Sequence, residues 1–140
     1  MSSIGKPERA TQDRVRTLLR DELHYDDLGT WADRGDRNSH IEESLLTRHL
    51  AASGYSPAQI GIALHKLRTE ARNPNRLLAA NNQAVYGLLR YGVEVQAEAG
   101  KPCERVQLVD WTDADRNHFA FAEEVTLSGG HERRHEEWDY

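Results

Sequence analysis

The sequence is poor in cysteine and has no long apolar run. Its single cysteine, Cys103, excludes an internal disulfide and fits a reducing compartment, so we expect a cytoplasmic protein. No apolar run approaches the length of a membrane-spanning helix, and the opening residues, MSSIGKPERA, lack the hydrophobic stretch of a signal peptide. We therefore expect no membrane partner.

Basic residues are in the minority. Lys and Arg number 18 against 23 Asp and Glu, and the formal net charge is -5. This balance argues against a self-sufficient DNA-binding module, although it is compatible with a local basic patch. The composition, 38% hydrophobic and 29% charged, is too apolar for a disordered chain and indicates one soluble, domain-sized unit.

Several signatures of catalysis are absent or weak. The chain has neither the G-x-x-x-x-G-K-[ST] loop that binds phosphates nor the G-x-S-x-G turn that carries the nucleophilic serine of α/β-hydrolases. Cys103 follows Lys-Pro in a predicted turn, where a surface cysteine is the simpler interpretation than a catalytic thiol. Glu123 and Glu124 are adjacent on a predicted strand, so their carboxylates point to opposite faces and cannot readily share a metal ion. We interpret Trp31 and Trp111 as core or loop anchors rather than base-stacking platforms.

The periodicity of apolar residues changes along the chain. Helical spacing, with a cap signal at Ser56-Pro57 and ends at Gly54 and Gly92, predicts four helices over residues 8–23, 40–55, 56–71 and 76–91. The Asp- and Gly-rich residues 25–38 are predicted as a loop. After Gly92 the period becomes 2, which predicts a short antiparallel meander over residues 93–98, 105–111 and 118–127. The expected fold class is α+β, with a helical N-terminal two-thirds followed by the meander.

The last ten residues contain H-E-x-x-H, formed by His131, Glu132 and His135. On a helix this spacing places two imidazoles on one face to bind zinc, with the Glu as general base. The surrounding segment is almost entirely charged, whereas a zinc hydrolase needs an apolar helix face and a third ligand. We interpret the match as accidental and keep a zinc hydrolase as a remote alternative.

The order of several longer motifs is more specific than any of them alone. They are ERATQDRV, NSHIEESLLTRHLAASGYSPAQI, NPNRLL, AVYGLLRYGVEV, EAG, VQLVDW, HFAFAEEVTL and HERR. Over residues 8–134 this series resembles the N-terminal region of the R (restriction) subunit of type I restriction endonucleases. The stretches LLRYGVEV and FAFAEEVTL, with VDW between them, make the resemblance specific.

The resemblance implies a nuclease domain of the PD-(D/E)xK type with an α/β core. It implies Mg²⁺-dependent DNA cleavage coupled to ATP-driven translocation, with the modification and specificity subunits as partners; Mg²⁺ and ATP would serve the full subunit, and we expect no cofactor for this chain alone. Carboxylates suit a hard Mg²⁺ ion. Glu8 would be the helix carboxylate and a metal contact, with Gln12 one turn further on the same face. For Glu8, a favourable charge in the first helical turn is the simpler alternative.

The sequence departs from the family after Arg134. The family continues with Pro-Asp, Asn-Gly and Glu-x-Lys, whereas this chain continues HEEWDY, with Glu136 at the place of the Asp. Glu136 is therefore a second metal candidate, and Arg133 and Arg134 are candidate DNA contacts. We expect residues 1–134 to form the first part of a nuclease domain and residues 135–140 a divergent, disordered tail.

Two departures from the family are milder. His24 and His118 stand where the family has Gly and Asp, which puts local turn geometry in question.

We expect a shortened R subunit with an incomplete PD-(D/E)xK core that is catalytically incompetent alone. Its exposed strand edges would favour self-association. The alternative is a non-catalytic interaction module that binds the other subunits of the restriction complex.

Overall fold

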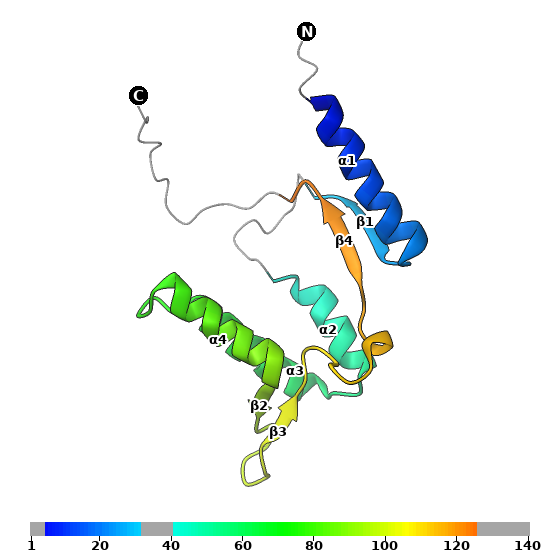
Figure 1. Ribbon diagram of the computed structural model, residues 1–140. Helices are drawn as coiled ribbons and strands as arrows, with labels where there is room; N and C mark the ends of the chain where they lie inside the picture. Colours follow the sequence, from blue (N-terminus) through cyan, green and yellow to red (C-terminus); the bar gives the residue numbers. More distant parts are fainter. Residues whose placement is uncertain (1–4, 32–40, 126–140) are drawn as a thin grey trace, which may run out of the picture. The chain divides into compact units, whose positions relative to one another are not determined.

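The computed structural model describes residues 5–31 and 41–125 (Figure 1). The chain divides into two compact units, which we call unit 1 (residues 1–41 and 119–140) and unit 2 (residues 42–118). Four α-helices and four short strands lie in the described ranges, and the strands form two separate two-stranded sheets. The predicted α+β class is confirmed.

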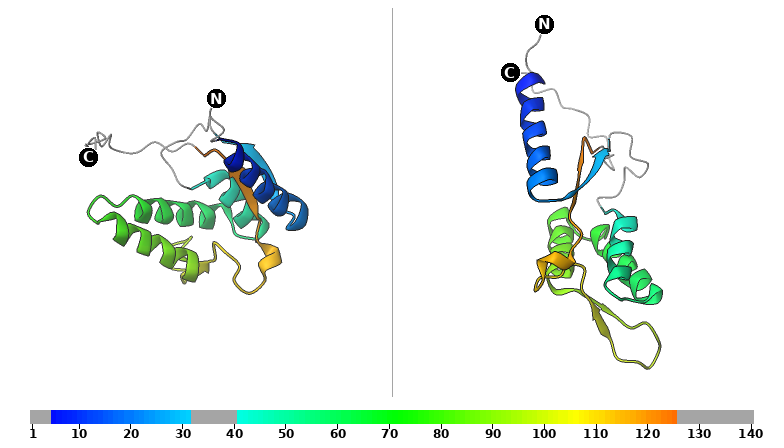
Figure 2. Two further views of the ribbon diagram at one scale, coloured as in Figure 1. Left: turned by 45° about the horizontal axis from the view of Figure 1, so that its top comes forward. Right: turned by 90° about the vertical axis from the view of Figure 1, so that its right-hand side faces the viewer.

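Three helices form most of unit 2, and all three were predicted. They are α2 (Glu43–Ala52), α3 (Pro57–Ala71) and α4 (Leu78–Tyr91). A capping box begins α3: Ser56 Oγ accepts from the Gln59 backbone N–H at 3.2 Å, and Gln59 Oε1 accepts from the Ser56 N–H at 2.8 Å. In Figures 1 and 2, α3 and α4 lie side by side.

The core of unit 2 lies between these helices and a hairpin. Strands β2 (Val93–Val95) and β3 (Glu104–Val106) pair antiparallel, as predicted, with Val93 opposite Val106. The valines of β2 are buried and its central Glu94 is exposed, as the period of 2 predicts. The buried apolar side chains are Leu50, Ile60, Ala63, Leu67, Val93, Val95, Val106 and Leu108.

Gly92 makes the connection from α4 to β2. Its backbone has φ 86° and ψ 175°, a region that is open essentially to glycine alone. The N–H of Gly92 still donates to the Leu88 carbonyl at 2.9 Å, which ends the helix. The chain can therefore turn directly from the last helical turn into a buried strand.

The described part of unit 1 contains one long helix beside a two-stranded parallel sheet. Helix α1 (Gly5–Thr17) continues into a π-helical turn over Leu18–Glu22. Strand β1 (Asp26–Thr30) pairs parallel with β4 (Ala120–Glu123). His24, which stands where the resemblance expects Gly, has φ 58°, so the turn into β1 does use a left-handed residue.

Two predictions about strands were wrong. Residues 25–38 were predicted as a loop, but Asp26–Thr30 form β1, because pairing with β4 outweighs the low strand propensity of Asp and Gly. The third strand of the predicted meander pairs with β1 and not with β3. A 3₁₀ turn over Ala114–Arg116 lies between β3 and β4, so no tight hairpin joins those two strands. The predicted boundary at residues 134 and 135 lies outside the described residues and stays a prediction.

The helices of the described ranges are too short or too polar for a membrane span; none would cross a bilayer. The longest of them, α3, has 15 residues.

Candidate functional site

One face of α1 presents a row of polar side chains at four-residue spacing. The row consists of Glu8, Gln12 and Arg16, which a helix places above one another. Gln12 and Arg16 both reach β4 or its C-terminal end, so this face of α1 lies against the small sheet. The helix and β4 run in opposite directions, since residues 12 and 16 meet residues 124 and 123 in that order.

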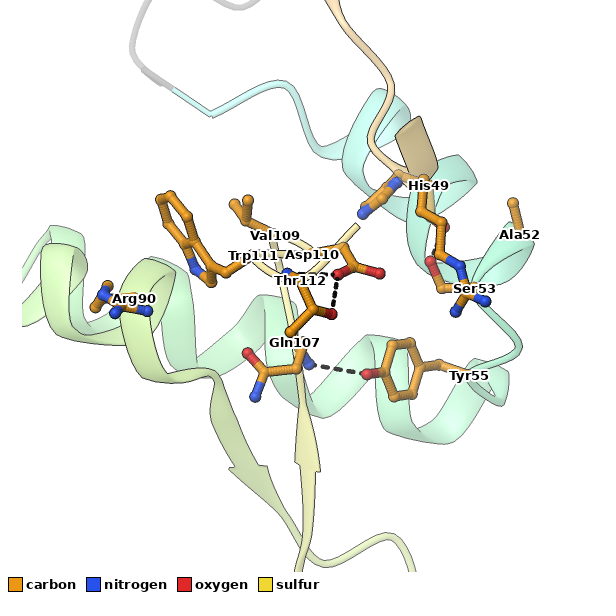
Figure 3. Close-up of a pocket in the computed structure, with 11 residues that line it drawn as sticks. His49, Ala52, Ser53, Tyr55, Arg90, Gln107, Val109, Asp110, Trp111 and Thr112 are labelled. Atoms are coloured by element: carbon orange, nitrogen blue, oxygen red, sulfur yellow. Dashed lines mark hydrogen bonds between the residues drawn. The ribbon is translucent and has the colours of Figure 1, made fainter. Parts of the chain in front are cut away.

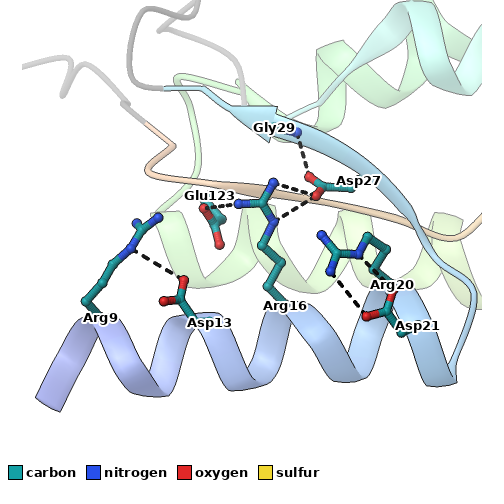
Figure 4. A network of polar contacts seen from close by, with 8 residues as sticks. All are labelled: Arg9, Asp13, Arg16, Arg20, Asp21, Asp27, Gly29 and Glu123. Atoms are coloured by element: carbon teal, nitrogen blue, oxygen red, sulfur yellow. Dashed lines mark hydrogen bonds and ion pairs between the residues drawn. The ribbon is translucent and has the colours of Figure 1, made fainter.

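Arg16 joins three elements of unit 1 (Figure 4). Its Nε and Nη2 donate to Asp27 Oδ2 at 2.8 and 2.7 Å, and its Nη1 lies 3.7 Å from Glu123 Oε2. The two carboxylates belong to the two paired strands: Asp27 lies opposite Phe121, and Glu123 lies opposite Thr30. One guanidinium therefore stabilises the parallel sheet and attaches it to the helix.

Asp27 is the most constrained acid of this network. Its Oδ1 accepts from the Gly29 backbone N–H at 2.9 Å, and its Oδ2 accepts from Arg16. The Gly29 hydrogen bond first, and then the bond from Arg16, lower the pKa of the Asp27 carboxyl below its usual value. Asp27 is thus held as a carboxylate, and both its oxygens are occupied.

Gln12 contacts the residue that follows β4. Its Nε2 donates to Glu124 Oε1 at 3.1 Å. Glu124 has φ 54°, so the chain leaves the strand there and Glu124 is not part of the regular alternation of β4. Glu123 pairs with Arg16 and Glu124 with Gln12, so the two adjacent carboxylates have separate partners.

The described part of unit 1 does not by itself form a metal site. No group of three or more His, Cys, Asp or Glu side chains in residues 5–31 and 41–125 is arranged to hold a metal ion. Two of the nearby carboxylates already pair with Arg16. Glu8 is exposed at the start of the row, so as it stands it offers Mg²⁺ a single ligand, which does not fit the several oxygen ligands that the ion requires.

The other predicted site residues fall into two groups. Cys103 is a free, exposed thiol in the loop between β2 and β3, as the surface interpretation predicts. The candidates of the last segment lie outside the described residues: His131, Glu132, Arg133, Arg134, His135 and Glu136.

Sequence reasoning missed Arg16 and Asp27. Arg16 extends the Glu8–Gln12 spacing by one more turn, a signal that was present in the sequence. Asp27 lay in a segment predicted as a loop, and nothing local shows that β4 would lie beside it.

The architecture defines the chain as an α+β protein whose N-terminal helix lies against a parallel strand pair. The model of one protein family, described as type I restriction enzyme R protein N terminus, matches residues 6–136. The chain belongs to this family, which confirms the resemblance seen in its motifs. No curated protein and no solved structure matches it significantly.

Proposed function

We propose that the chain supplies the first helix and strands of the DNA-cleaving domain of a type I restriction R subunit, and that these 140 residues do not cleave DNA by themselves. Membership in the family supports the first part. The Gln12–Glu124 hydrogen bond carries the assignment to a site, because it sets the face of α1 that bears Glu8 against the end of β4. In a nuclease of this kind, Glu8 would then lie beside the first core strand.

The proposal that these residues do not cleave DNA by themselves depends on the ligands available to Mg²⁺. Glu8 would be a peripheral metal contact, and Gln12 would keep the helix beside β4. The ligands that complete a Mg²⁺ site, the motor that uses ATP and the DNA contacts would belong to the full subunit and to its assembly. Arg133 and Arg134 stay candidate DNA contacts.

The test combines the purified chain with the modification and specificity subunits of its own system. We expect the chain to co-elute with them in size-exclusion chromatography. On addition of Mg²⁺, ATP and unmodified plasmid we expect no nicked or linear DNA. Plasmid cleavage that Glu8→Gln abolishes would contradict the inactivity of the chain, and elution of the chain apart from the other subunits would contradict its place in the complex.

A second function, a non-catalytic interaction module, has one observation in its favour. Several large apolar side chains of α4 and of the residue before it are exposed: Leu77, Leu78, Tyr86 and Tyr91. Exposed apolar side chains that another protein covers are one explanation for this pattern. If this is the main role, Tyr86→Ala abolishes co-elution and excess chain slows cleavage by the complete enzyme. If the chain is only an inactive piece, Tyr86→Ala leaves co-elution unchanged and excess chain has no effect. Multi-angle light scattering on the free chain tests the expected self-association.

A further inference from the structure

Unit 2 contains a pocket of about 620 Å³, which lies within the range of small-molecule sites (Figure 3). It is bordered by the end of α2, the residues that follow it, the end of α4 and the segment after β3. Figure 3 shows Trp111 and Arg90 on one side and His49, Ser53 and Tyr55 on the other. The pocket is remote in sequence from the Glu8 row and belongs to unit 2 alone.

Trp111 is held in place and yet open to solvent. Its Nε1 donates to the Leu89 carbonyl at 3.0 Å, which fixes the indole against the end of α4. The residue is nevertheless 56% exposed. A fixed aromatic ring loses little conformational entropy when another ring stacks on it. The sequence predicted Trp111 as an anchor and not as a stacking platform.

Arg90 is oriented by two aromatic rings. Its guanidinium carbon lies 5.3 Å from the centroid of Trp111 and 5.6 Å from that of Tyr91. Both distances are within the range of cation–π contacts. A guanidinium held over part of a half-exposed indole can bind a phosphate next to a base that stacks on the exposed part of the ring.

The rest of the pocket favours a polar ring over a purely apolar ligand. The Tyr55 hydroxyl accepts from the Gln107 backbone N–H at 2.9 Å, so its own O–H remains a donor. Gln107 also lines the pocket and has an amide with both donors and an acceptor. These groups can pair with the edge of a nucleobase.

The acid of the pocket is already engaged. Asp110 Oδ1 accepts from the backbone N–H groups of Asp113 and Thr112 and from the Thr112 hydroxyl at 2.8 to 3.0 Å. It orders the loop that carries Trp111. Of the two arginines that line the pocket, Arg116 has its Nε 3.5 Å from Asp113 Oδ2, and Arg90 lies on the side of Trp111 in Figure 3. Arg90 is therefore the cation placed to meet a phosphate next to a ring on Trp111.

We propose that this pocket binds a nucleotide, with the base stacked on Trp111, the phosphate at Arg90 and the base edge at Tyr55 and Gln107. The shared chemistry is a nucleobase with an attached phosphate, and it can come from single-stranded DNA or from a free nucleotide. The site does not depend on the proposed restriction function, because it uses none of the residues of unit 1. Either proposal can fail without the other.

The test uses the full chain with Trp31→Phe and Trp138→Phe, so that Trp111 is the only tryptophan. Its fluorescence is titrated with deoxyadenosine monophosphate, with a short single-stranded oligodeoxyadenylate and with inorganic phosphate. We expect saturable quenching by the two nucleotide probes and weaker binding of phosphate. Tighter binding of the oligonucleotide by about tenfold or more points to a DNA strand, and equal binding points to a free nucleotide; both support the pocket.

Two sets of variants separate stacking and charge from misfolding. Arg90→Gln should weaken nucleotide binding by roughly fivefold or more, while Arg48→Gln, which removes an equal charge from an exposed position of α2, should change it by less than about twofold. By calorimetry on the unaltered background, Trp111→Ala should weaken binding by about tenfold, and Trp111→Phe should restore most of it.

Three results would overturn the proposal. The first is absence of saturable quenching by either nucleotide probe. The second is binding of inorganic phosphate as tight as that of deoxyadenosine monophosphate, which would leave an anion site without base recognition. The third is an equal loss in Arg48→Gln and Arg90→Gln, which would mean non-specific attraction.

Discussion

Units 1 and 2 are stabilised by different forces. All eight buried apolar side chains of the described ranges lie in unit 2. In unit 1 the side chains Val15, Leu18, Leu23 and Phe119 are between 43% and 51% exposed. What joins α1, β1 and β4 is chiefly polar: the Arg16 ion pairs and the Gln12–Glu124 bond, with the Tyr25–Phe119 ring stack 5.0 Å between centroids.

The difference has a functional meaning. An apolar core keeps its stability over a wide range of pH and salt, whereas partly exposed ion pairs weaken as salt screens them or as acid protonates them. The unit that holds the family's predicted catalytic helix is therefore the one with less burial in its described part. Unit 2 is the better scaffold for a preformed pocket, because its walls rest on a packed core.

Truncation of a core side chain should have the largest effect. Leu50 is fully buried in α2, and we expect Leu50→Ala to lower the free energy of unfolding by about 2–5 kcal/mol, since it removes apolar contacts and leaves a cavity. Leu18→Ala, at a position 43% exposed in unit 1, is the matched control and should cost below about 1 kcal/mol. Urea denaturation followed by circular dichroism measures both. Equal losses would contradict the difference in burial between the units.

Gly92→Ala should have the next effect. The backbone there is strained for any residue with a Cβ, and the added atom would lie 2.8 Å from Arg105 Cγ and 3.0 Å from the Val106 carbonyl oxygen. We expect a loss of about 3 kcal/mol. Gly54→Ala separates the two causes: Gly54 also has a positive φ, 94°, but nothing lies within 4 Å of its added Cβ, so about 1 kcal/mol is expected. Thermal unfolding measures both variants. Similar losses of unfolding free energy in Gly92→Ala and Gly54→Ala would mean that small shifts of Arg105 and Val106 remove the close contact at little energetic cost.

Local sequence signals predicted unit 2 better than unit 1. The capping box at Ser56, the stop at Gly92 and the alternation of Val93 and Val95 each act within a few residues, so the helices and the hairpin could be predicted. Strand β1 could not, because Asp and Gly give DDLGT a low strand propensity and its partner lies about ninety residues away. Pairing at such separation depends on the whole fold.

The candidate site shows the same limit. The spacing of Glu8 and Gln12 predicted a common helix face, and the row on α1 agrees with it. The partners of that face, Asp27 and Glu124, depend on how β1 and β4 meet α1. In unit 2, Trp111 was interpreted as an anchor, and its bond to Leu89 agrees, but its exposure follows from a tertiary arrangement that no local pattern encodes.

Acid should affect the two units differently. A substitution of Asp27 should have the smallest of the expected effects and the one most specific to unit 1. The pKa of Asp27 is lowered in the folded state by the Gly29 hydrogen bond and by Arg16, so the unfolded chain takes up its proton first as the pH falls. The stability that this carboxylate contributes is complete above the unfolded pKa, about 4, and is lost as the pH falls through the folded value. We expect Asp27→Asn to weaken amide protection in β1 and β4 at neutral pH and to flatten its decline in acid, as measured by hydrogen exchange corrected for its intrinsic pH dependence. Asp110→Asn is the matched control, because the hydrogen bond from the Asp113 backbone N–H, and then the one from the Thr112 hydroxyl, lower the pKa of Asp110 in unit 2. Its effect should be confined to the loop around Thr112 and should leave β1 and β4 unchanged. If Asp27→Asn altered β2 and β3 as strongly as β1 and β4, the two units would unfold as one, and the contrast between a polar and an apolar unit would have no consequence for stability.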